Sequence, residues 1–211
     1  MEDAVVFVEV GGWSPGMVIL DAMEKTACVR VLQAELNDQP GVCLKMTGSL
    51  GDARAAADSA EQIARQMQVA CIVDIIPSPA PGAELAFNPP PDYNPLFDQG
   101  TIHVPQAPAK SKGKGRTVSM QNNDFAVGLI ETQGFTAVFE AIDTALKTAS
   151  VEVLAREKLG GGYITVLIKG DVAAVSAAIE AAKPKVEGLG RLIAAHVIPN
   201  PSPGVLSLIP K

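Results

Sequence analysis

The chain has few of the residues on which enzymes and metal centres depend. Its 211 residues include three cysteines and two histidines. Cys28, Cys43 and Cys71 lie in apolar runs at spacings that fit neither a metal site nor a disulfide framework, so we expect buried small hydrophobes. His103 and His196 have no Cys or Ser beside them in a recognisable nucleophile motif. We therefore expect no enzymatic activity, no catalytic residue, no metal site and no bound cofactor.

Long hydrophobic runs and an excess of positive charge are also absent. No stretch approaches the roughly 20 apolar residues of a membrane span, and the start of the chain lacks the basic region of a signal peptide. These features predict a cytosolic protein that binds no membrane. The formal net charge of −6 argues against binding to nucleic acid, because such proteins need positive surface to displace counterions from phosphates. The short basic run from Lys110 to Arg116 is most simply a solvated linker.

What the sequence does contain is a long internal repeat. Residues 4–82 align with residues 126–204 without a gap, at a constant offset of 122 positions. Glu9 thus matches Glu131, and Gly12 matches Gly134. This register predicts two similar domains, residues 1–82 and 126–211, joined by a Pro/Gly/Lys-rich linker over residues 83–125. Each domain is small enough that we expect burial against a partner.

The same series of elements is predicted in both copies. An apolar strand ends at a glycine, an amphipathic helix follows, two extended runs form a hairpin, and an Ala-rich helix precedes a last strand. The fold class is therefore α+β, with two tandem ferredoxin-like β-α-β-β-α-β domains in non-permuted order. Each would have a four-stranded antiparallel sheet with helices on one face, so the open face needs a cover. We also expect Phe87, Tyr93, Leu96 and Phe97 to dock the first half of the linker on a domain surface.

A run of three glycines is the most conspicuous loop. Gly160, Gly161 and Gly162 join two strands of a hairpin, whereas phosphate-binding glycine loops join a strand to a helix and carry a Lys-Ser/Thr pair. We interpret the run as a tight turn or as a place where symmetry-related backbones approach closely. The equivalent turn of the first copy consists of Asn37, Asp38, Gln39 and Pro40, which are common turn residues.

Two repeated charged positions have more than one interpretation. Lys25 and Lys147 close their helices, where a cation offsets the helix dipole, and an intermolecular contact would explain them equally well. Glu9 and Glu131 end the first strand of each copy. A carboxylate at this position fits a bond to backbone or to a neighbouring copy as well as it fits a general base.

Several motifs of the second copy together resemble the bacterial microcompartment shell proteins. They are Glu131-Thr132 and the ranges 145–151, 157–162, 169–172 and 196–199. The resemblance covers the whole second copy and, more loosely, the first. It is to the tandem-domain members, which form trimers that mimic the hexamers of single-domain relatives.

The resemblance implies a structural role rather than catalysis. It predicts a homotrimer that forms a pseudohexameric tile in the microcompartment shell of the bacterial cytoplasm, beside other shell proteins and encapsulated enzymes. Asn37, Asp38, Gln39 and Pro40 would line a central pore for small metabolites or cofactors, together with Gly160, Gly161 and Gly162. Lys25, Lys147, Ser78 and Asn200 would lie at the tile edge.

Two departures from the family pattern modify these expectations. Single-domain relatives usually have arginine between the two prolines of the last edge motif, where this chain has Ser78 and Asn200, so contacts between tiles would be weaker or more selective. Some tandem members hold an iron–sulfur cluster through a pore-loop cysteine, which this chain lacks. The alternative function is a small-molecule sensor or regulatory binding protein, because tandem ferredoxin-like domains often bind metabolites at their interfaces.

Overall fold

The computed structural model describes residues 3–37, 41–91, 100–106 and 125–209. The first half of the chain contains β1 (Ala4–Gly11), α1 (Trp13–Thr26), β2 (Val29–Asn37), β3 (Gly41–Gly48), α2 (Leu50–Met67), β4 (Cys71–Ile76), α3 (Glu84–Phe87) and β5 (Ile102–His103). The second half contains β6 (Ala126–Gln133), α4 (Phe135–Thr148), β7 (Glu152–Gly160), β8 (Tyr163–Gly170), α5 (Val172–Ala182), the 3₁₀ helix η1 (Lys183–Val186), β9 (Arg191–Pro199) and α6 (Pro203–Leu208).

Local sequence explains where the second helix of each domain begins and ends. Ser49 accepts a hydrogen bond from Asp52 N at the start of α2, and Asp171 accepts one from Ala174 N at the start of α5. These side chains satisfy backbone donors that the first helical turn leaves without partners. Helix α5 ends at Ala182, because Pro184 lies in the 3₁₀ turn that follows.

Each domain has the predicted β-α-β-β-α-β order and an antiparallel sheet. The strand orders are β4-β1-β3-β2-β5 and β7-β8-β6-β9. The expectation of four strands per sheet is wrong for the first domain. Strand β5, from the predicted linker, pairs with β2 through His103 and Ile102 opposite Ala34 and Glu35. The edge of a sheet exposes unpaired backbone groups, so a short segment of linker can extend it.

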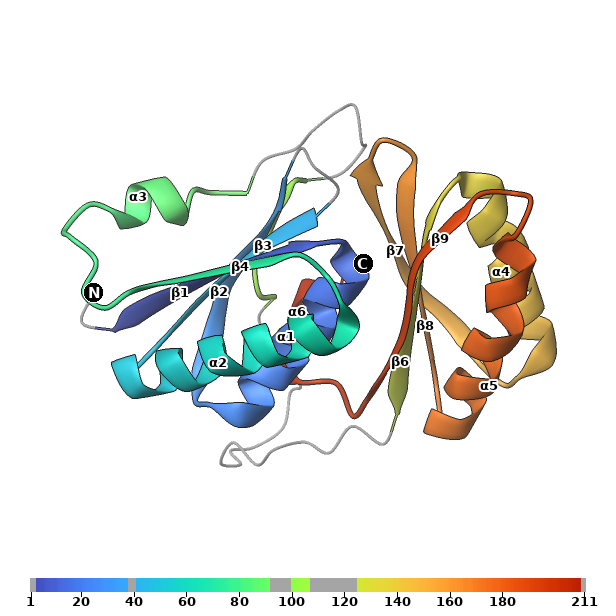
Figure 1. Cartoon of the computed structure of the whole chain (residues 1–211), viewed down its shortest axis with the longest axis horizontal. Helices are drawn as coiled ribbons and strands as arrows, with labels where there is room; N and C mark the ends of the chain where they lie inside the picture. Colours follow the sequence, from blue (N-terminus) through green and yellow to red (C-terminus); the bar gives the residue numbers. More distant parts are fainter. Residues whose placement is uncertain (1–2, 38–40, 92–99, 107–124, 210–211) are drawn as a thin grey trace, which may run out of the picture.

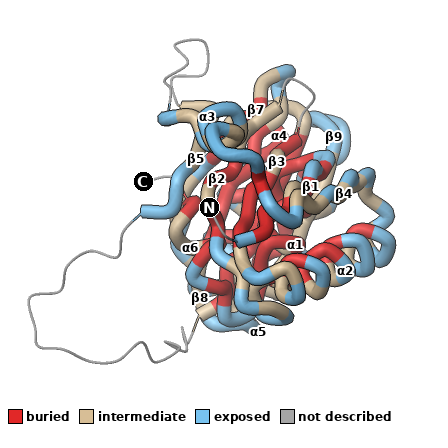
Figure 2. The backbone as a smooth tube through the Cα atoms, turned by 90° about the vertical axis from the view of Figure 1, so that its left-hand side faces the viewer, coloured by how far each residue is buried: buried red, intermediate tan, exposed pale blue. Residues whose placement is uncertain are grey.

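The layers of the molecule alternate between sheet and helix. Helices α4 and α5 cover the outer face of the second sheet, and α1 lies between the first domain and the inner face of the second sheet (Figure 1). Nine of the fourteen residues of α1 are buried, which makes the helix red along most of its length in Figure 2. One apolar cluster therefore continues from the first domain into the second, and it includes Trp13, Met17, Leu129 and Leu167. A second cluster lies between α4, α5 and their own sheet.

Part of the predicted linker packs on the first sheet. The rings of Phe87 and Phe7 meet edge to face, with centroids 5.5 Å apart. This contact confirms the docking expected for Phe87, whereas Tyr93, Leu96 and Phe97 lie outside the described residues. Within the part of the chain that the structure describes, every helix is too short or too polar to cross a bilayer.

Candidate functional site

The two domains of the chain pack against each other through a helix and a sheet. Helix α1 of the first domain lies against β6 and β9 of the second. Trp13 and Met17 face this contact and are fully buried. The open face of the second sheet, which the sequence required something to cover, is thus covered by a helix from the other domain. Burial of two side chains of this size contributes about 3–6 kcal/mol of hydrophobic stabilisation.

A carboxylate from the second sheet caps the start of α1. Ser14 N donates to Oε2 of Glu131 at 2.8 Å, and the side chain of Glu131 is completely buried. Burial raises the pKa of Glu131, while the backbone N–H groups of Ser14 and Trp13 and the hydroxyl of Thr165 lower it. The N-terminus of a helix carries a partial positive charge, so an ionised carboxylate is favourable there. The structure therefore gives Glu131 the backbone-bonding role rather than that of a base.

A row of polar residues crosses the second sheet beside this cap. Thr165 of β8 pairs with Glu131 on one side and with Glu157 on the other. Oε2 of Glu157 lies 3.5 Å from Nε2 of His103, which comes from the linker strand β5. The His103 ring also packs on Trp13, with ring centroids 5.0 Å apart. The linker thus contributes to the contact between the domains, a role that the sequence pattern does not reveal.

The C-terminal segment completes the contact at the other end of α1. Ser202 N donates to Oδ1 of Asp21 at 2.8 Å, and Gly204 N donates to Oε2 of Glu24 at 2.7 Å. Burial raises the pKa of Glu24, and the bonds from Ser202 and Gly204 oppose this effect. Helix α6 packs on α1 just beyond these bonds.

Each side of this contact has an equivalent in the other domain, 122 positions away in the sequence, that does not take part in the contact. Phe135 and Phe139 of α4 correspond to Trp13 and Met17, yet they are 39% and 52% exposed. Glu9 corresponds to Glu131 and is exposed; it accepts a hydrogen bond from Nδ2 of Asn37 at 2.7 Å. The first domain therefore has the equivalent of the sheet side of this contact, and the second domain has the equivalent of the helix side.

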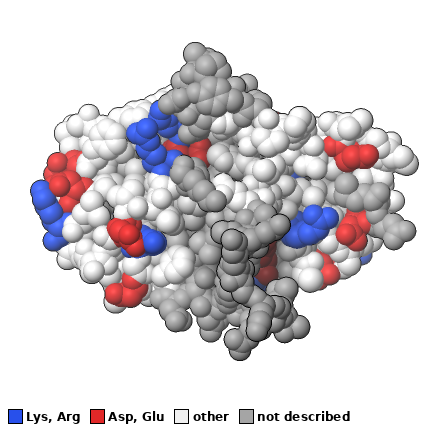
Figure 3. Space-filling view, turned by 180° about the vertical axis from the view of Figure 1, so that it is seen from behind, with Lys and Arg blue, Asp and Glu red and all other residues white. Residues whose placement is uncertain are grey.

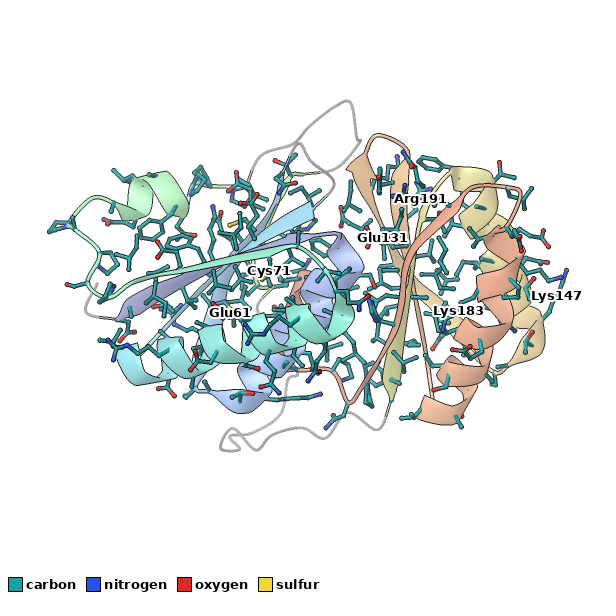
Figure 4. All side chains as sticks on the ribbon, viewed as in Figure 1. Glu61, Cys71, Glu131, Lys147, Lys183 and Arg191 are labelled. Atoms are coloured by element: carbon teal, nitrogen blue, oxygen red, sulfur yellow. The ribbon has the colours of Figure 1, made fainter. Side chains whose placement is uncertain are left out.

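The predicted tile-edge residues are mostly exposed. Nζ of Lys25 donates to Asp21 at 2.6 Å and to the carbonyl of Pro199 at 3.1 Å, which brings it beside Asn200. Lys147 pairs with Asp143 of its own helix, and this pairing raises its pKa. Figure 4 places Lys147 on the outer side of α4, far from Glu131. Ser78 is exposed in the loop after β4.

Of the predicted pore residues, the structure describes Asn37 and the three glycines. Gly160, Gly161 and Gly162 have φ angles of 84°, 57° and 82°, a left-handed conformation that favours glycine. Gly162 O accepts a hydrogen bond from Gly134 N at 2.9 Å, which ties this turn to the start of α4. Asn37 ends β2, whereas Asp38, Gln39 and Pro40 lie outside the described residues.

The prediction for the cysteines is wrong. Cys28 is exposed, and Cys43 and Cys71 are half-buried. Cys28 lies in the turn between α1 and β2, Cys43 lies on the open face of the first sheet, and Cys71 begins an edge strand. Partial burial raises the pKa of the thiols of Cys43 and Cys71. Among the described residues, no three His, Cys, Asp or Glu side chains are grouped to hold a metal ion.

The surface charge has no single-sign patch on the face seen in Figure 3. Described acidic and basic side chains are scattered there, often beside one another. A nucleic-acid-binding face would instead gather Lys and Arg. His196 of β9 is half-buried. Burial is the main cause that lowers its pKa, and the positive charge of the nearby Lys183 lowers it further.

Comparisons with known proteins match both repeats. The family model described as the BMC domain matches residues 4–79 and 126–201. The chain is 43% identical over 86 residues to the bacterial microcompartment shell protein PduA of Citrobacter freundii, which is 41% of this chain and 92% of that protein. It is 43% identical over 83 residues to the carboxysome shell protein CsoS1A of Hydrogenovibrio crunogenus, covering 39% of this chain and 86% of that protein.

Another curated relative and a solved structure also match. The bacterial microcompartment shell protein EutM of Escherichia coli K12 is 42% identical over 76 residues, covering 36% of this chain and 78% of that protein. A crystal structure of a microcompartment protein from Desulfitobacterium hafniense DCB is 24% identical, with a TM-score of 0.38. That match covers 96% of this chain and 97% of the other.

Proposed function

We propose that three copies of this chain close into one pseudohexameric tile. The proposal starts from the family: the chain belongs to the BMC-domain family of bacterial microcompartment shell proteins and carries two such domains. The protein is a structural, non-enzymatic component. Its place is the microcompartment shell in the bacterial cytoplasm. Residues 1–82 and 126–211 supply the two tile units of each copy, and residues 83–125 connect them.

The observation that carries this proposal is the contact between the domains within one chain. It is heterologous, because a helix of the first domain meets a sheet of the second. Repeated contacts of this kind generate a ring when the rotation closes. The second domain still presents α4, and within the described residues no helix of another domain covers the open face of the first sheet, so a second copy can continue the series.

The continuing contact follows from the repeat offset. Phe135 and Phe139 of one copy take the places of Trp13 and Met17 on the sheet of the next. Thr136 N, which corresponds to Ser14 N, then donates to Glu9 of the neighbour. This contact buries two exposed aromatic side chains and supplies a carboxylate to the start of α4.

A central opening follows if the equivalent hairpin turns meet around the ring axis. One set of turns is Gly160, Gly161 and Gly162, where the lack of side chains leaves backbone groups facing the opening. The other set is Asn37, Asp38, Gln39 and Pro40, which places carboxylates and amides between them. We expect small metabolites or cofactors to cross this pore, with charge and size as the selecting properties.

The tile edge contains Lys25, Lys147, Ser78 and Asn200. Support comes from the bond between Lys25 and the carbonyl of Pro199, because it places two of these positions together although they belong to different domains. Contact with other shell proteins, and with encapsulated enzymes, would pass through this edge and the tile faces.

The assembly is tested by replacing Phe139 with serine. Loss of one aromatic side chain from each contact removes about 1.5–3 kcal/mol, so we expect the ring to weaken more than tenfold per contact. Analytical ultracentrifugation of wild type and Phe139→Ser over a concentration series measures this. Electron microscopy of the wild type should show hexagonal layers.

The matched control is Val172→Ser, which removes a side chain of similar exposure, 49%, from the start of α5 outside the proposed contact. The control should assemble like the wild type. A wild-type protein that stays monomeric at high concentration, or a Phe139→Ser variant that assembles as tightly as the control, would contradict the proposal.

A further inference from the structure

The open face of the first sheet is already occupied by a segment of its own chain. This segment, residues 84–89, is called the strap below. The ring of Phe87 packs on Phe7, and Nε2 of Gln33 donates to Oδ1 of Asn88 at 2.8 Å and to the carbonyl of Pro89 at 3.1 Å. Beneath the strap, Gln33 is fully buried.

The strap lies on the same part of the first sheet that α1 covers on the second. By the repeat offset, Phe7 corresponds to Leu129 and Gln33 to Ala155. Leu129 is buried in the cluster that contains Trp13 and Met17 of α1, and Ala155 packs against that cluster. The strap and α4 of a neighbouring copy would therefore cover the same surface.

The end of this surface that receives the start of the helix is free of the strap. A hollow of about 320 Å³ lies beside Glu9 and is lined further by Val10, Gly11, Asn37 and residues 70–72. On the second sheet the equivalent carboxylate, Glu131, bonds the first turn of α1. The docking surface thus consists of an open end at Glu9 and a covered middle at Phe7.

We propose that the strap is a temporary occupant of the docking surface for α4 of a second copy, and that it must leave before the ring closes. This inference rests on the proposed trimer. The free chain is held in a closed form in which Phe7 is shielded from water. The assembled chain has α4 of its neighbour in the same place.

The contacts of the strap suit a segment that can be displaced. Its helix, α3, has only four residues, and short helices are marginal in water without tertiary support. Leu85 is 80% exposed, and the contacts described between the strap and the sheet are one aromatic pair and two bonds from Gln33. Helix α4 brings Phe135, Phe139 and an N-terminus to the same surface, which buries more apolar area.

Displacement has a measurable consequence for assembly. A partner whose binding surface is open for only a fraction of the time binds with an affinity reduced by that fraction. Phe87→Ala removes the aromatic contact of the strap and leaves α4 and the sheet unchanged. We expect trimers of this variant to form at least fivefold faster than wild-type trimers when dissociated chains are returned to assembly conditions, measured by stopped-flow light scattering.

Leu85→Ala is the matched control, because it shortens an exposed side chain of the same helix. It should assemble at the wild-type rate. A second measurement follows the strap itself: in Phe87→Trp, the new indole should shift its emission to longer wavelength on trimer formation, against the constant contribution of the buried Trp13.

The outcomes separate the two proposals. Faster assembly of Phe87→Ala together with the red shift supports the strap inference. If wild type, Phe87→Ala and Leu85→Ala form trimers at equal rates, or if trimers of Phe87→Ala are weaker, the strap inference is overturned while the tile stands. If none of the three chains forms trimers, the proposed function fails, and the strap inference fails with it.

Discussion

Single side chains decide how the two domains recognise each other. Glu131 is buried, and its Oε2 accepts a hydrogen bond from Ser14 N at the start of α1. Burial is the strongest influence on its pKa, and it favours the protonated form. Glu157 lies beyond Thr165 in the same row of the sheet, and His103 of the linker lies beside Glu157. A charge at this position therefore links the stability of the domain contact to pH.

Replacement of Glu131 by glutamine should remove the contribution of this carboxyl group to the pH dependence of the free energy of unfolding. Burial raises the pKa of Glu131 in the folded chain above its ordinary value of 4.5. Between these two values the folded chain retains a proton that the unfolded chain has released, so stability is lost as pH rises through the folded pKa. Each unit of difference between the folded and unfolded pKa values changes the free energy of unfolding by about 1.4 kcal/mol.

Glutamine keeps an acceptor for Ser14 N but does not titrate. The free energy of unfolding of Glu131→Gln, relative to wild type, should therefore increase as pH rises from about 4.5 to 7.5. Urea titrations of both proteins at several pH values measure this difference. A difference that is constant with pH would show that Glu131 titrates alike in the folded and unfolded chains.

Two helices at equivalent positions of the repeat have different surroundings in this molecule. Helix α1 is enclosed between two sheets, whereas α4 has one face against its own sheet and one face exposed. The entry into α1 depends on Gly12, whose φ of 99° is left-handed. A Cβ there would lie 3.2 and 3.3 Å from the carboxylate oxygens of Glu131. The close approach of the second domain and the turn into the helix thus require the same glycine.

Gly12→Ala should destabilise the chain by about 2 kcal/mol, because the left-handed backbone costs about 1–2 kcal/mol for a residue with Cβ and the cap must also move. Gly11→Ala is its neighbouring control, since a Cβ at Gly11 meets nothing within 4 Å. The control should change stability by less than about 1 kcal/mol. Chemical denaturation of both variants compares them, and equal losses would refute the role of Gly12.

The molecule as a whole supplies one third of the proposed ring. One apolar cluster contains buried residues of both domains, so the two domains pack against each other rather than being joined by the linker alone. The repeat supplies one internal contact and leaves the matching pair of surfaces at its two ends. In the proposed ring these ends disappear, and two kinds of hairpin turn alternate around the axis.

This alternation leads to a prediction about transport. A ring of Asp38 carboxylates should repel anions, while glycine backbone N–H groups of the other turns attract them. Shells assembled from Asp38→Asn protein should therefore pass small anions faster than wild-type shells, by severalfold at low salt and by less at high salt, where charges are screened. Flux of a small anion into purified shells measures this. Unchanged flux would remove Asp38 from the selectivity of the pore.

The amino-acid pattern was sufficient to predict two domains, their α+β class and the β-α-β-β-α-β order of elements in each, because the repeat offset, the helical periods and the capping residues are local signals. It also located Phe87, whose apolar ring needed a surface. Three features became visible only in the folded chain: Glu131 caps a helix 117 positions earlier, the linker adds β5 and the strap, and the cysteines are partly exposed. These features depend on which faces meet across long stretches of chain, and local composition and periodicity do not encode that.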